Sequence, residues 1–303
     1  MILNCLDALA ELAPGIGAVV VDNASSDHTV EKVRSRSTVR LIENRDNRGF
    51  AGAVNQGFRE CGTEVVLLLN PDVRLRTPVS ALIEACRTHG IAAGQLTEAN
   101  GAAQRGFTIR RFPTAASLIF ELLGLNRLWP GNRINHLYRY LDRDLNQGGP
   151  VEQPAGAFLM VRRDVWEKLG GFDEDFHPVW FEDVDFCQRA KDSGYRIEYL
   201  PDVKAAHSGG HSVKKLPPAR MEEYWYASLL TYAAKHFRPG PYRAVCLAAV
   251  LSAVPRSVAG LIRGRSLNPV VSCCKIIQLA VKRLVSRNGR NSGLGAPKTS
   301  KEY

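Results

Sequence analysis

The strongest restriction on the fold of this chain comes from a short apolar run, Val65–Leu69, which stops at Asn70-Pro71-Asp72. Such a run is typical of a strand that is buried on both faces, as in sheets covered by helices. Pro71 ends the strand pairing because proline has no amide hydrogen to donate. Asp72 is therefore expected at the rim of a sheet, where folds of this class bind ligands.

Strand-like and helix-like segments alternate around this run, and Asp27 is well placed to cap the first helix that follows a strand. The expected strands cover residues 18–21, 39–43, 65–69, 157–161 and 197–200, and another opens at residues 94–96. The expected helices cover residues 28–36, 50–60, 80–88, 164–169, 183–193 and 219–236, with a helical insertion over 107–150 and an apolar segment over 242–262 that breaks at Pro255. This alternation predicts an α/β fold with a mixed, mostly parallel sheet and flanking helices.

The length and composition fit a globular protein. The 303 residues are 45% hydrophobic and 23% charged, which suits one large domain or one domain with an appendage. The seven cysteines lack the spacing of a metal site or a disulfide framework, which predicts reduced thiols in the cytoplasm. The longest apolar run, residues 244–254, is shorter than the roughly 20 residues that cross a bilayer. We therefore expect no transmembrane helix.

Positive charge is concentrated in the last third of the chain. Residues 1–203 contain 23 Lys and Arg against 27 Asp and Glu, whereas residues 204–303 contain 17 against 3. This predicts contact with an anionic membrane surface or with nucleic acid, or simply a solvated basic segment. Nucleic acid is disfavoured because aromatic residues are not interleaved with the basic ones. We expect an α/β domain over residues 1–215, a helical basic extension over 216–285 and a disordered tail over 286–303.

Several polar residues could take part in chemistry, and each also has a plain structural explanation. Asp22 ends the first expected strand, where a carboxylate can bind a nucleotide base or ribose, or can simply cap the next turn. Asp72 could hold Mg²⁺ or Mn²⁺ together with substrate phosphates, or could complete a type I turn with Pro71. His207 and His211, in HSGGHS, could complete a metal site or could face solvent. The residues alone leave these alternatives open.

A second acidic segment, WFEDVDF, carries a further candidate. Asp183 stands at the start of an expected helix, from where it could take a proton from an acceptor hydroxyl as a general base. Trp180 and Phe181 could stack on the face of a sugar. The alternative is that Asp183 caps the helix, that Asp185 interacts favourably with the helix dipole and that the aromatic rings belong to the core.

Taken together, these segments resemble the inverting glycosyltransferase family 2, and within it the rhamnosyltransferase-like branch. The resemblance is carried by VVVDNASSD, NRGFAGAVNQGF, VVLLLNPDVRL, GAFLMVRRDVWEKLGGFDEDF, FEDVDFCQRAKDSGYRI and HSGGHS, which follow the family's order over about residues 16–215. It implies a GT-A type fold, a nucleoside-diphosphate sugar as donor, and Mg²⁺ or Mn²⁺ as cofactor.

The resemblance also implies roles for individual residues. Asp183 matches the catalytic base, Asp72 matches a metal ligand of an Asp-x-Asp motif whose first position is Asn70 here, and His207 matches a residue that binds metal or diphosphate. The donor pocket would be lined by Asp22, which would bind the base, and by Asn47, Gly49, Asn55 and Asn70. The acceptor would meet Trp180, Phe181 and Glu182.

In this branch the donor is commonly dTDP-rhamnose and the acceptor is a polyprenyl-diphosphate-linked saccharide of cell-envelope polysaccharide synthesis. Asp183 would deprotonate the acceptor hydroxyl, which would displace the nucleoside diphosphate with inversion at C1. A lipid-linked acceptor predicts a cytoplasmic protein that binds the inner face of the cell membrane through its basic C-terminal third. A nucleotidyltransferase and a catalytically impaired protein that binds the membrane surface are the alternatives.

The N-terminus departs from the family pattern. The chain begins inside an amphipathic helix that contains Leu3, Leu6, Leu9 and Leu12, whereas family members open with a strand at the centre of the sheet. We therefore expect a sheet that lacks its first strand and exposes two strand edges. Such a chain is expected to express poorly or to be inactive until codons upstream of Met1 are included.

Overall fold

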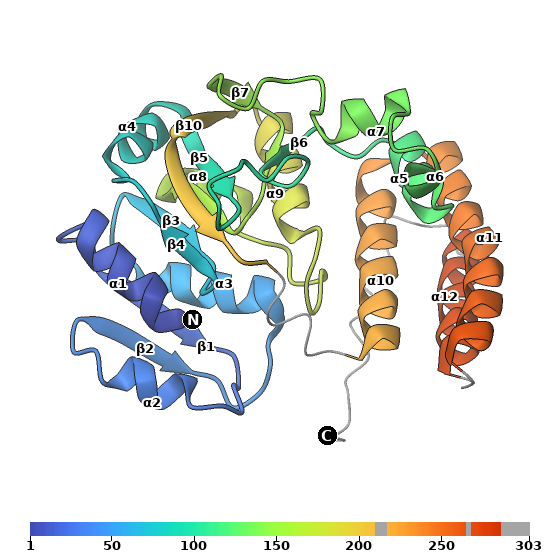
Figure 1. The fold of residues 1–303 in the computed structure, drawn as a ribbon, viewed down its shortest axis with the longest axis horizontal. Coiled ribbons are helices and arrows are strands. Elements are labelled where there is room, and N and C mark those ends of the chain that lie inside the picture. Colours follow the sequence, from blue (N-terminus) through green and yellow to red (C-terminus); the bar gives the residue numbers. More distant parts are fainter. Residues whose placement is uncertain (210–216, 265–267, 286–303) are drawn as a thin grey trace. The chain divides into compact units, whose positions relative to one another are not determined.

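The computed structural model describes residues 1–209, 217–264 and 268–285 (Figure 1). As far as they are described, these residues form two compact units. Unit 1 consists of Met1–Phe112, His136–Asp173 and Glu182–Ser212, and unit 2 consists of Pro113–Asn135, Glu174–Phe181 and Val213–Tyr303.

Unit 1 is an α/β unit in which helices and strands alternate as predicted. Its helices are α1 (Ile2–Leu12), α2 (Thr29–Arg34), α3 (Gly49–Glu60), α4 (Ser80–His89), α8 (Arg163–Leu169) and α9 (Glu182–Asp192). Its strands are β1 (Ala18–Asp22), β2 (Val39–Glu43), β3 (Val65–Leu69), β4 (Val73–Leu75), β5 (Gly90–Thr97), β6 (Ile109–Arg110), β7 (Gly149–Val151), β8 (Gln153–Pro154), β9 (Phe158–Arg162) and β10 (Arg196–His207). The predicted N-cap is wrong by one residue: α2 begins at Thr29 and its N-cap is His28, while Oδ1 of Asp27 accepts a hydrogen bond from the amide of Thr29 at 3.1 Å in the turn before the helix.

The main sheet has six strands in the order β3-β9-β5-β10-β4, and β7 also pairs with β10. Within this sheet β5 and β10 run parallel, and the other pairings are antiparallel. The prediction of a mixed sheet is confirmed, but the prediction of a mostly parallel one is wrong. The reason is that β9 runs antiparallel between β3 and β5, and an alternation pattern does not reveal where a strand inserts.

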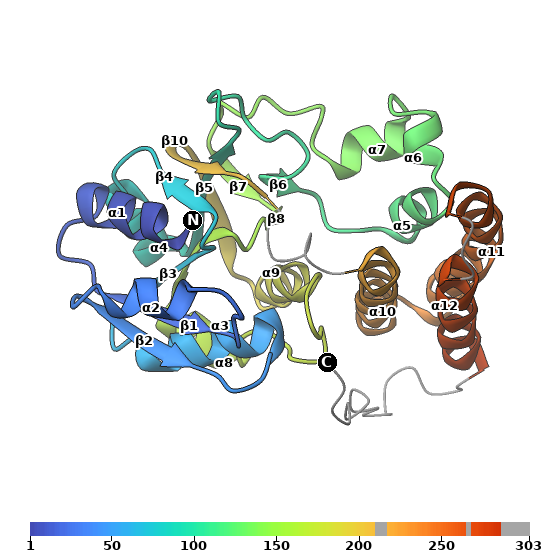
Figure 2. The same ribbon diagram turned by 60° about the horizontal axis from the view of Figure 1, so that its bottom comes forward.

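Two further pairs of strands lie outside the main sheet: β1 and β2 run parallel, and β6 and β8 run antiparallel. Helices α2 and α3 pack on the pair of β1 and β2 (Figure 2). Within the part of the chain that the structure describes, β1 pairs only with β2, and β3 pairs only with β9. The expectations about a missing strand and about expression stay predictions.

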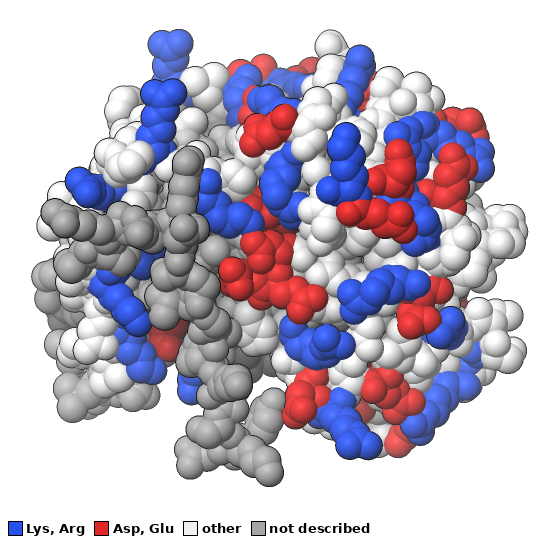
Figure 3. Space-filling model, turned by 180° about the vertical axis from the view of Figure 1, so that it is seen from behind, with Lys and Arg blue, Asp and Glu red and all other residues white. Residues whose placement is uncertain are grey.

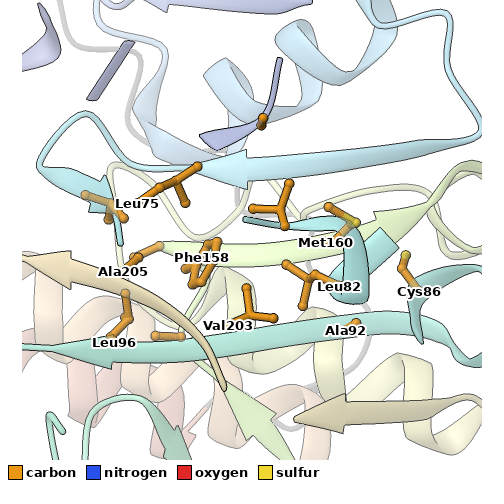
Figure 4. Close-up of a cluster of buried hydrophobic side chains, with 14 of the residues drawn as sticks. Leu75, Leu82, Cys86, Ala92, Leu96, Phe158, Met160, Val203 and Ala205 are labelled. Carbon is orange, nitrogen blue, oxygen red and sulfur yellow. The ribbon is translucent and has the colours of Figure 1, made fainter. Parts of the chain in front are cut away.

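The core of unit 1 forms where α4 covers the main sheet (Figure 4). Leu82 and Cys86 of α4 are fully buried, and they belong to one cluster with Leu96 of β5 and with Phe158 and Met160 of β9. At roughly 25 cal/mol per Å², burial of such side chains is the main favourable term that holds helix and sheet together. The rim of this sheet is therefore a rigid support for the residues that follow its strands.

β10 is longer than predicted, because the sequence indicated only residues 197–200. It runs over Arg196–His207 and passes through Pro201. Its register against β5 shifts between Leu200 and Lys204, so the proline falls where the regular ladder is interrupted. The extra length carries the chain as far as His207.

Charged side chains of both signs are interspersed over much of the face shown in Figure 3. Ion pairs on the surface of unit 1 include Arg87 with Glu64, at 3.1 Å, and Arg162 with Asp164, at 2.6 Å. Exposed pairs of this kind contribute about 0–1 kcal/mol each. They affect solubility more than they affect the fold.

Unit 2 is helical. It contains α5 (Ala115–Leu122), α6 (Leu125–Leu128), α10 (Pro218–His236), α11 (Pro239–Gly264) and α12 (Asn268–Val285), and α7 (Arg133–Tyr138) runs from unit 2 into unit 1. Helix α11 packs against α5, α10 and α12. It continues through Pro255, so the predicted break is wrong: a proline removes one backbone hydrogen bond, and the packing of α11 outweighs that loss.

No helix of the described residues is both long and apolar enough to cross a bilayer. The predicted disordered tail, residues 286–303, and His211 lie outside the described residues.

Candidate active site

Asp72 and His207 are brought together by the pairing of β4 with β10. Asp72 directly precedes β4, and His207, the last residue of β10, lies opposite Val73 in the antiparallel register. The amide of Ser208 donates a hydrogen bond to the carbonyl oxygen of Asp72 at 3.2 Å. Nε2 of His207 lies 3.6 Å from Oδ2 of Asp72, and the two side chains are only 5% and 7% exposed. Two predicted site residues therefore share one place at the sheet rim.

Burial determines the electrostatics around this pair. It lowers the pKa of His207, although the charges of Asp72 and Glu98 oppose the shift. Cys5 of α1 donates its thiol to the carbonyl oxygen of Asn70 at 3.7 Å. Burial and the nearby charge of Asp72 raise the pKa of Cys5 to about 12, so this cysteine is a neutral thiol and not a nucleophile.

The structural explanation for Asn70-Pro71-Asp72 holds as well. The amide of Val73 donates to the carbonyl oxygen of Asn70 at 3.0 Å, which closes a tight turn. The turn leads directly into β4, and the pairing of β4 with β10 places Asp72 beside β10. Turn formation and a role for Asp72 in a site are thus compatible.

Asp183 lies in the first turn of α9, where two backbone amides hold its carboxylate. The amide of Gly156 donates to Oδ2 and the amide of Val184 donates to Oδ1, each at 2.8 Å. Burial raises the pKa of Asp183, and the two hydrogen bonds and the charge of Arg110 oppose this increase. The bond to Val184 agrees with the capping explanation, whereas the bond from Gly156 fixes the carboxylate from a different segment.

A short series of backbone contacts connects Asp183 with the turn at Asp72. Gly156 binds Asp183, and the next residue, Ala157, accepts a hydrogen bond from the amide of Asn70 at 3.0 Å. Asn70 is two residues before Asp72. The two acidic segments are therefore anchored to the same stretch of chain ahead of β9.

Glu182 has a buried carboxyl group, one oxygen of which lacks a hydrogen-bond partner among the described residues. Its side chain is 3% exposed, and among the described residues Oε2 has no hydrogen-bond partner. Burial and the neighbouring charge of Asp183 raise the pKa of Glu182 well above its usual range. This environment favours the protonated form of Glu182.

Trp180 and Phe181 belong to unit 2, and both have a left-handed backbone, with φ of 79° and 70°. Non-glycine residues rarely adopt this conformation, and such strain of about 1–3 kcal/mol per residue gathers at functional sites. The ring of Phe181 lies 5.5 Å from that of Tyr232 and is 9% exposed, which supports a core position for this ring. Contact of either ring with an acceptor stays a prediction.

Asp22 and the segment around Gly49 meet at the end of β1. Oδ2 of Asp22 accepts a hydrogen bond from the amide of Ser25 at 3.0 Å, so Asp22 does cap its turn. The neighbouring Asn23 donates through Nδ2 to Oδ1 of Asn47 at 2.8 Å and to the carbonyl oxygen of Gly49 at 3.1 Å. The structure thus brings Asn47 and Gly49 together with the carboxyl end of β1.

Asn55 is placed differently from the other predicted donor residues. It is 7% exposed, its Nδ2 donates to the carbonyl oxygen of Phe172 at 2.8 Å, and its Oδ1 accepts from the amide of Phe172 at 2.9 Å. These bonds tie α3 to the loop before α9. A direct contact of Asn55 with a donor stays a prediction.

Two residues of the loop between β5 and β6, Gln104 and Phe107, reach the site together with Arg110 of β6, and the sequence interpretation missed all three. Gln104 hydrogen-bonds to His207, and the ring of Phe107 stacks on the imidazole of His207 with the centroids 5.1 Å apart. Arg110 lies over the rings of Phe107 and Tyr138, at 5.9 and 5.8 Å from their centroids. No motif marks these residues, and the only signal was their aromatic and basic composition.

The comparison with known families agrees with these positions. The sequence model of glycosyl transferase family 2 matches residues 1–170, and a second model, the N-terminal domain of galactosyltransferase, matches residues 142–211. The two matched ranges together include the residues of unit 1 described above.

Three curated relatives illustrate the similarity. The chain is 27% identical over 194 residues to the low-salt glycan biosynthesis hexosyltransferase Agl10 of Haloferax volcanii, a match that covers 63% of this chain and 58% of that protein. It is 27% identical over 239 residues to the N-acetylglucosaminyl-diphospho-decaprenol L-rhamnosyltransferase of Mycobacterium tuberculosis, covering 73% and 76%. It is 26% identical over 162 residues to the rhamnosyltransferase WbbL of Escherichia coli, covering 52% and 57%. The chain thus spans little more than half the length of two of these three relatives.

Solved structures share the fold. GalNAc-T7 with UDP, GalNAc and Mn²⁺ superimposes with a TM-score of 0.55 and 11% identity, over 95% of this chain and 54% of that one. The mannosyltransferase PcManGT from Pyrobaculum calidifontis, with GDP-Man and Mn²⁺, gives a TM-score of 0.51 and 17% identity, over 94% and 84%. The fold is therefore of the GT-A type. Because the family model covers more than half of its length, the chain belongs to glycosyl transferase family 2.

Proposed function

We propose that this chain is an inverting glycosyltransferase that moves a sugar from a nucleoside-diphosphate sugar to an acceptor hydroxyl. The observation that carries the proposal is the carboxylate of Asp183, which Gly156 orients in the same unit that holds the Asp72–His207 pair. Asp183 takes the proton of the acceptor hydroxyl, whose oxygen attacks C1 of the sugar from the face opposite the diphosphate. The C1–oxygen bond to the diphosphate breaks, and the anomeric configuration inverts.

Asp72 and His207 are the residues that would hold Mg²⁺ or Mn²⁺. A carboxylate oxygen and an imidazole nitrogen that face each other at 3.6 Å are donors that these ions accept, so the residues fit the ion. Among the described residues no group of three or more His, Cys, Asp and Glu could hold a metal, so oxygens of the donor diphosphate would complete the coordination. The ion would neutralise charge on the leaving diphosphate. The Mn²⁺ named with two structures of the same fold supports this assignment.

The nucleotide would bind at the carboxyl end of β1. Asp22 would accept a hydrogen bond from the base, and Asn47 and Gly49 would line the same pocket, because Asn23 holds them beside Asp22. Asn70 would contact the donor next to the metal. Asn55 would act through its bonds to Phe172.

The names of two relatives favour rhamnose as the transferred sugar, with dTDP-rhamnose as donor. The mycobacterial relative is named for a diphospho-decaprenol acceptor, which favours a polyprenyl-diphosphate-linked saccharide here and a role in cell-envelope polysaccharide synthesis. Trp180, Phe181 and Glu182 directly precede Asp183 in the sequence, and we propose this segment for contact with that acceptor.

A lipid-linked acceptor requires contact with a membrane, and we propose that unit 2 supplies it at the cytoplasmic face. Leu247 and Leu251 stand one turn apart on α11 and are 53% and 56% exposed, with Arg243 one turn before them. Exposed leucines beside arginine are what a helix needs to lie at an anionic surface. Residues 204–303 contain 14 more Lys and Arg than Asp and Glu, and this positive charge also favours binding to an anionic membrane surface.

The direct test is a screen of nucleotide sugars with polyprenyl-diphosphate saccharides, in Mn²⁺ or Mg²⁺, that follows release of nucleoside diphosphate and the anomeric configuration of the product. The proposal expects acceptor-dependent release with inversion. Retention of configuration, or release of a nucleoside monophosphate with transfer of a sugar 1-phosphate to the acceptor, would contradict it.

A further inference from the structure

The side chain of Gln104 binds His207 with both of its polar atoms. Its Nε2 donates to the backbone carbonyl oxygen of His207 at 2.9 Å, and its Oε1 lies 3.1 Å from Nδ1 of the same residue. A carbonyl oxygen can only accept, so the NH₂ group of the amide must face it and Oε1 must face Nδ1. Oε1 also can only accept, so Nδ1 carries the hydrogen. In the neutral ring the free lone pair is then on Nε2.

Both members of this contact are held in place by other bonds. The amide of Gln104 donates to the carbonyl oxygen of Leu96 in β5 at 2.9 Å, and the amide of Thr108 donates to the carbonyl oxygen of Gln104 at 3.0 Å. The ring of Phe107 stacks on the imidazole with an interplanar angle of 13°. The imidazole of His207 is therefore fixed in its plane by Phe107 and in its rotation by Gln104.

We propose that Gln104 is a positioning residue: it fixes the tautomer and orientation of His207, so that the bare Nε2 faces Oδ2 of Asp72 and the two can bind one divalent cation. This inference rests on the proposed function, in which Asp72 and His207 hold the ion. Nε2 lies 3.6 Å from Oδ2, on the side of the ring opposite to the Gln104 contact. A histidine ligand whose second nitrogen donates to a fixed acceptor is a better ligand, and loss of that acceptor typically costs 10–100-fold in metal affinity.

The first measurement needs no metal. A two-bond ¹H–¹⁵N spectrum of the full chain after treatment with a chelator reports which imidazole nitrogen carries the hydrogen, and the His207→Asn variant assigns the signals. We expect the Nδ1–H form in the wild type and a mixture of tautomers in Gln104→Leu. Gln104→Glu loses the donor to the carbonyl oxygen of His207 but keeps an acceptor for Nδ1, and it should therefore keep the Nδ1–H form.

The second measurement is the affinity for Mn²⁺ alone, followed by electron paramagnetic resonance of the free ion. Gln104→Leu should bind Mn²⁺ 10–100-fold more weakly than the wild type, and Gln104→Glu should not. The matched control is Gln188→Leu: Gln188 also hydrogen-bonds through its side chain, to Asp192 at 2.9 Å on α9, but does not touch His207. It should leave both the tautomer and the affinity unchanged.

Three results overturn the inference: a wild-type His207 with hydrogen on Nε2 or on both nitrogens, a tautomer that Gln104→Leu leaves unchanged, or a changed tautomer with unchanged Mn²⁺ affinity. Failure of the proposed metal site has a different signature. In that case Asp72→Asn and His207→Asn also leave the Mn²⁺ affinity unchanged. Thermal unfolding of each variant separates these effects from loss of the fold.

Discussion

The amide of Gly156 donates a hydrogen bond of 2.8 Å to Oδ2 of Asp183, and the space between the two residues admits no larger side chain. A Cβ at position 156 would lie 2.9 Å from Cβ of Asp183, closer than real Cβ atoms come, and 3.2 Å from its Oδ2, which is tighter than most real contacts. Glycine at this position therefore sets where the carboxylate lies. It couples the segment ahead of β9 with the N-terminus of α9.

We expect Gly156→Ala to displace the carboxylate of Asp183 and to lower kcat about 10²-fold, since a shift of about 1 Å can have this effect. Donor binding, measured as the Kd for the nucleotide, should stay within twofold. The control is Gly62→Ala, because a Cβ at Gly62 meets nothing within 4 Å. A Gly156→Ala enzyme with wild-type kcat would show that the position of Asp183 is unimportant.

Asp183→Asn should lower the transfer rate about 10²–10⁴-fold, as expected for removal of a general base, and should leave donor binding intact. In the wild type, kcat/KM should rise with pH, because only the ionised carboxylate can accept a proton. Burial raises the pKa of Asp183, so this rise should fall above the usual range of an aspartate. The pH–rate profile checks the prediction, and a flat acid limb would assign the base elsewhere.

Glu182→Gln should stabilise the protein at neutral pH. Burial raises the pKa of Glu182 in the folded state, so the folded state binds this proton more tightly than the unfolded state does. The native protein therefore loses stability as the pH rises from the usual range of a glutamate through the raised pKa. Glutamine cannot ionise, so the variant avoids this loss.

The melting temperature of Glu182→Gln, compared with that of the wild type, should be higher at pH 8 and nearly equal at pH 4. Glu11→Gln, at an exposed position of α1, is the control and should show no such dependence. A Glu182→Gln variant that is less stable at pH 8 would mean that the ionised carboxylate has a partner.

How far the site could be predicted depended on whether a residue lies in a segment with a local pattern. Asp72 follows a strand that is recognisable from its apolar run, and Asp183 lies in the acidic first turn of a helix, so local patterns point to both as candidates, while their roles stay predictions. Gln104 lies in a loop, and its partner is 103 residues away. No local pattern reports a contact of that separation.

The same distinction explains the errors in the fold. Contacts between residues that are distant in the sequence determine that β9 lies between β3 and β5. A sequence of alternating strands and helices is equally compatible with a parallel sheet. Pro255 was read as a helix break because intrinsic propensity opposes proline, but the packing of α11 decides the outcome. Tertiary contacts outweighed a local preference in both cases.

Arg189 should be far more important for stability than a typical surface arginine. Its Nε contacts Oδ2 of the fully buried Asp185 at 2.7 Å, and its other nitrogens donate to the carbonyl oxygens of Leu169 and Gly171 at 2.5 and 2.8 Å. Loss of Arg189 removes the ion pair of a buried carboxylate and the hydrogen bonds to two carbonyl groups. We expect Arg189→Met to lower the free energy of unfolding by about 3–5 kcal/mol in urea titrations.

The matched control is Arg196→Met, which removes an exposed pair with Glu198 and should cost about 0–1 kcal/mol. Because Arg189 does not belong to the proposed donor or metal site, the folded fraction of Arg189→Met should retain metal binding. Equal losses of stability in the two variants would contradict a special role for the buried pair.

The last prediction concerns the exposed leucines of α11. Replacement of Leu247 and Leu251 by glutamine should weaken binding to anionic lipid vesicles at least tenfold in flotation assays. The reason is that the apolar side chain of each leucine can be buried at the lipid interface, whereas that of glutamine cannot. Binding of the wild type should fall as NaCl increases and should be weak on neutral vesicles, since the basic residues act by charge. Leu128→Gln is the control: Leu128 is 82% exposed on α6 and is not part of α11, and its replacement should leave vesicle binding unchanged. If the wild type stays unbound at low salt, or if all three leucines are equally dispensable, membrane contact through α11 is ruled out while the glycosyltransferase chemistry of unit 1 is not affected.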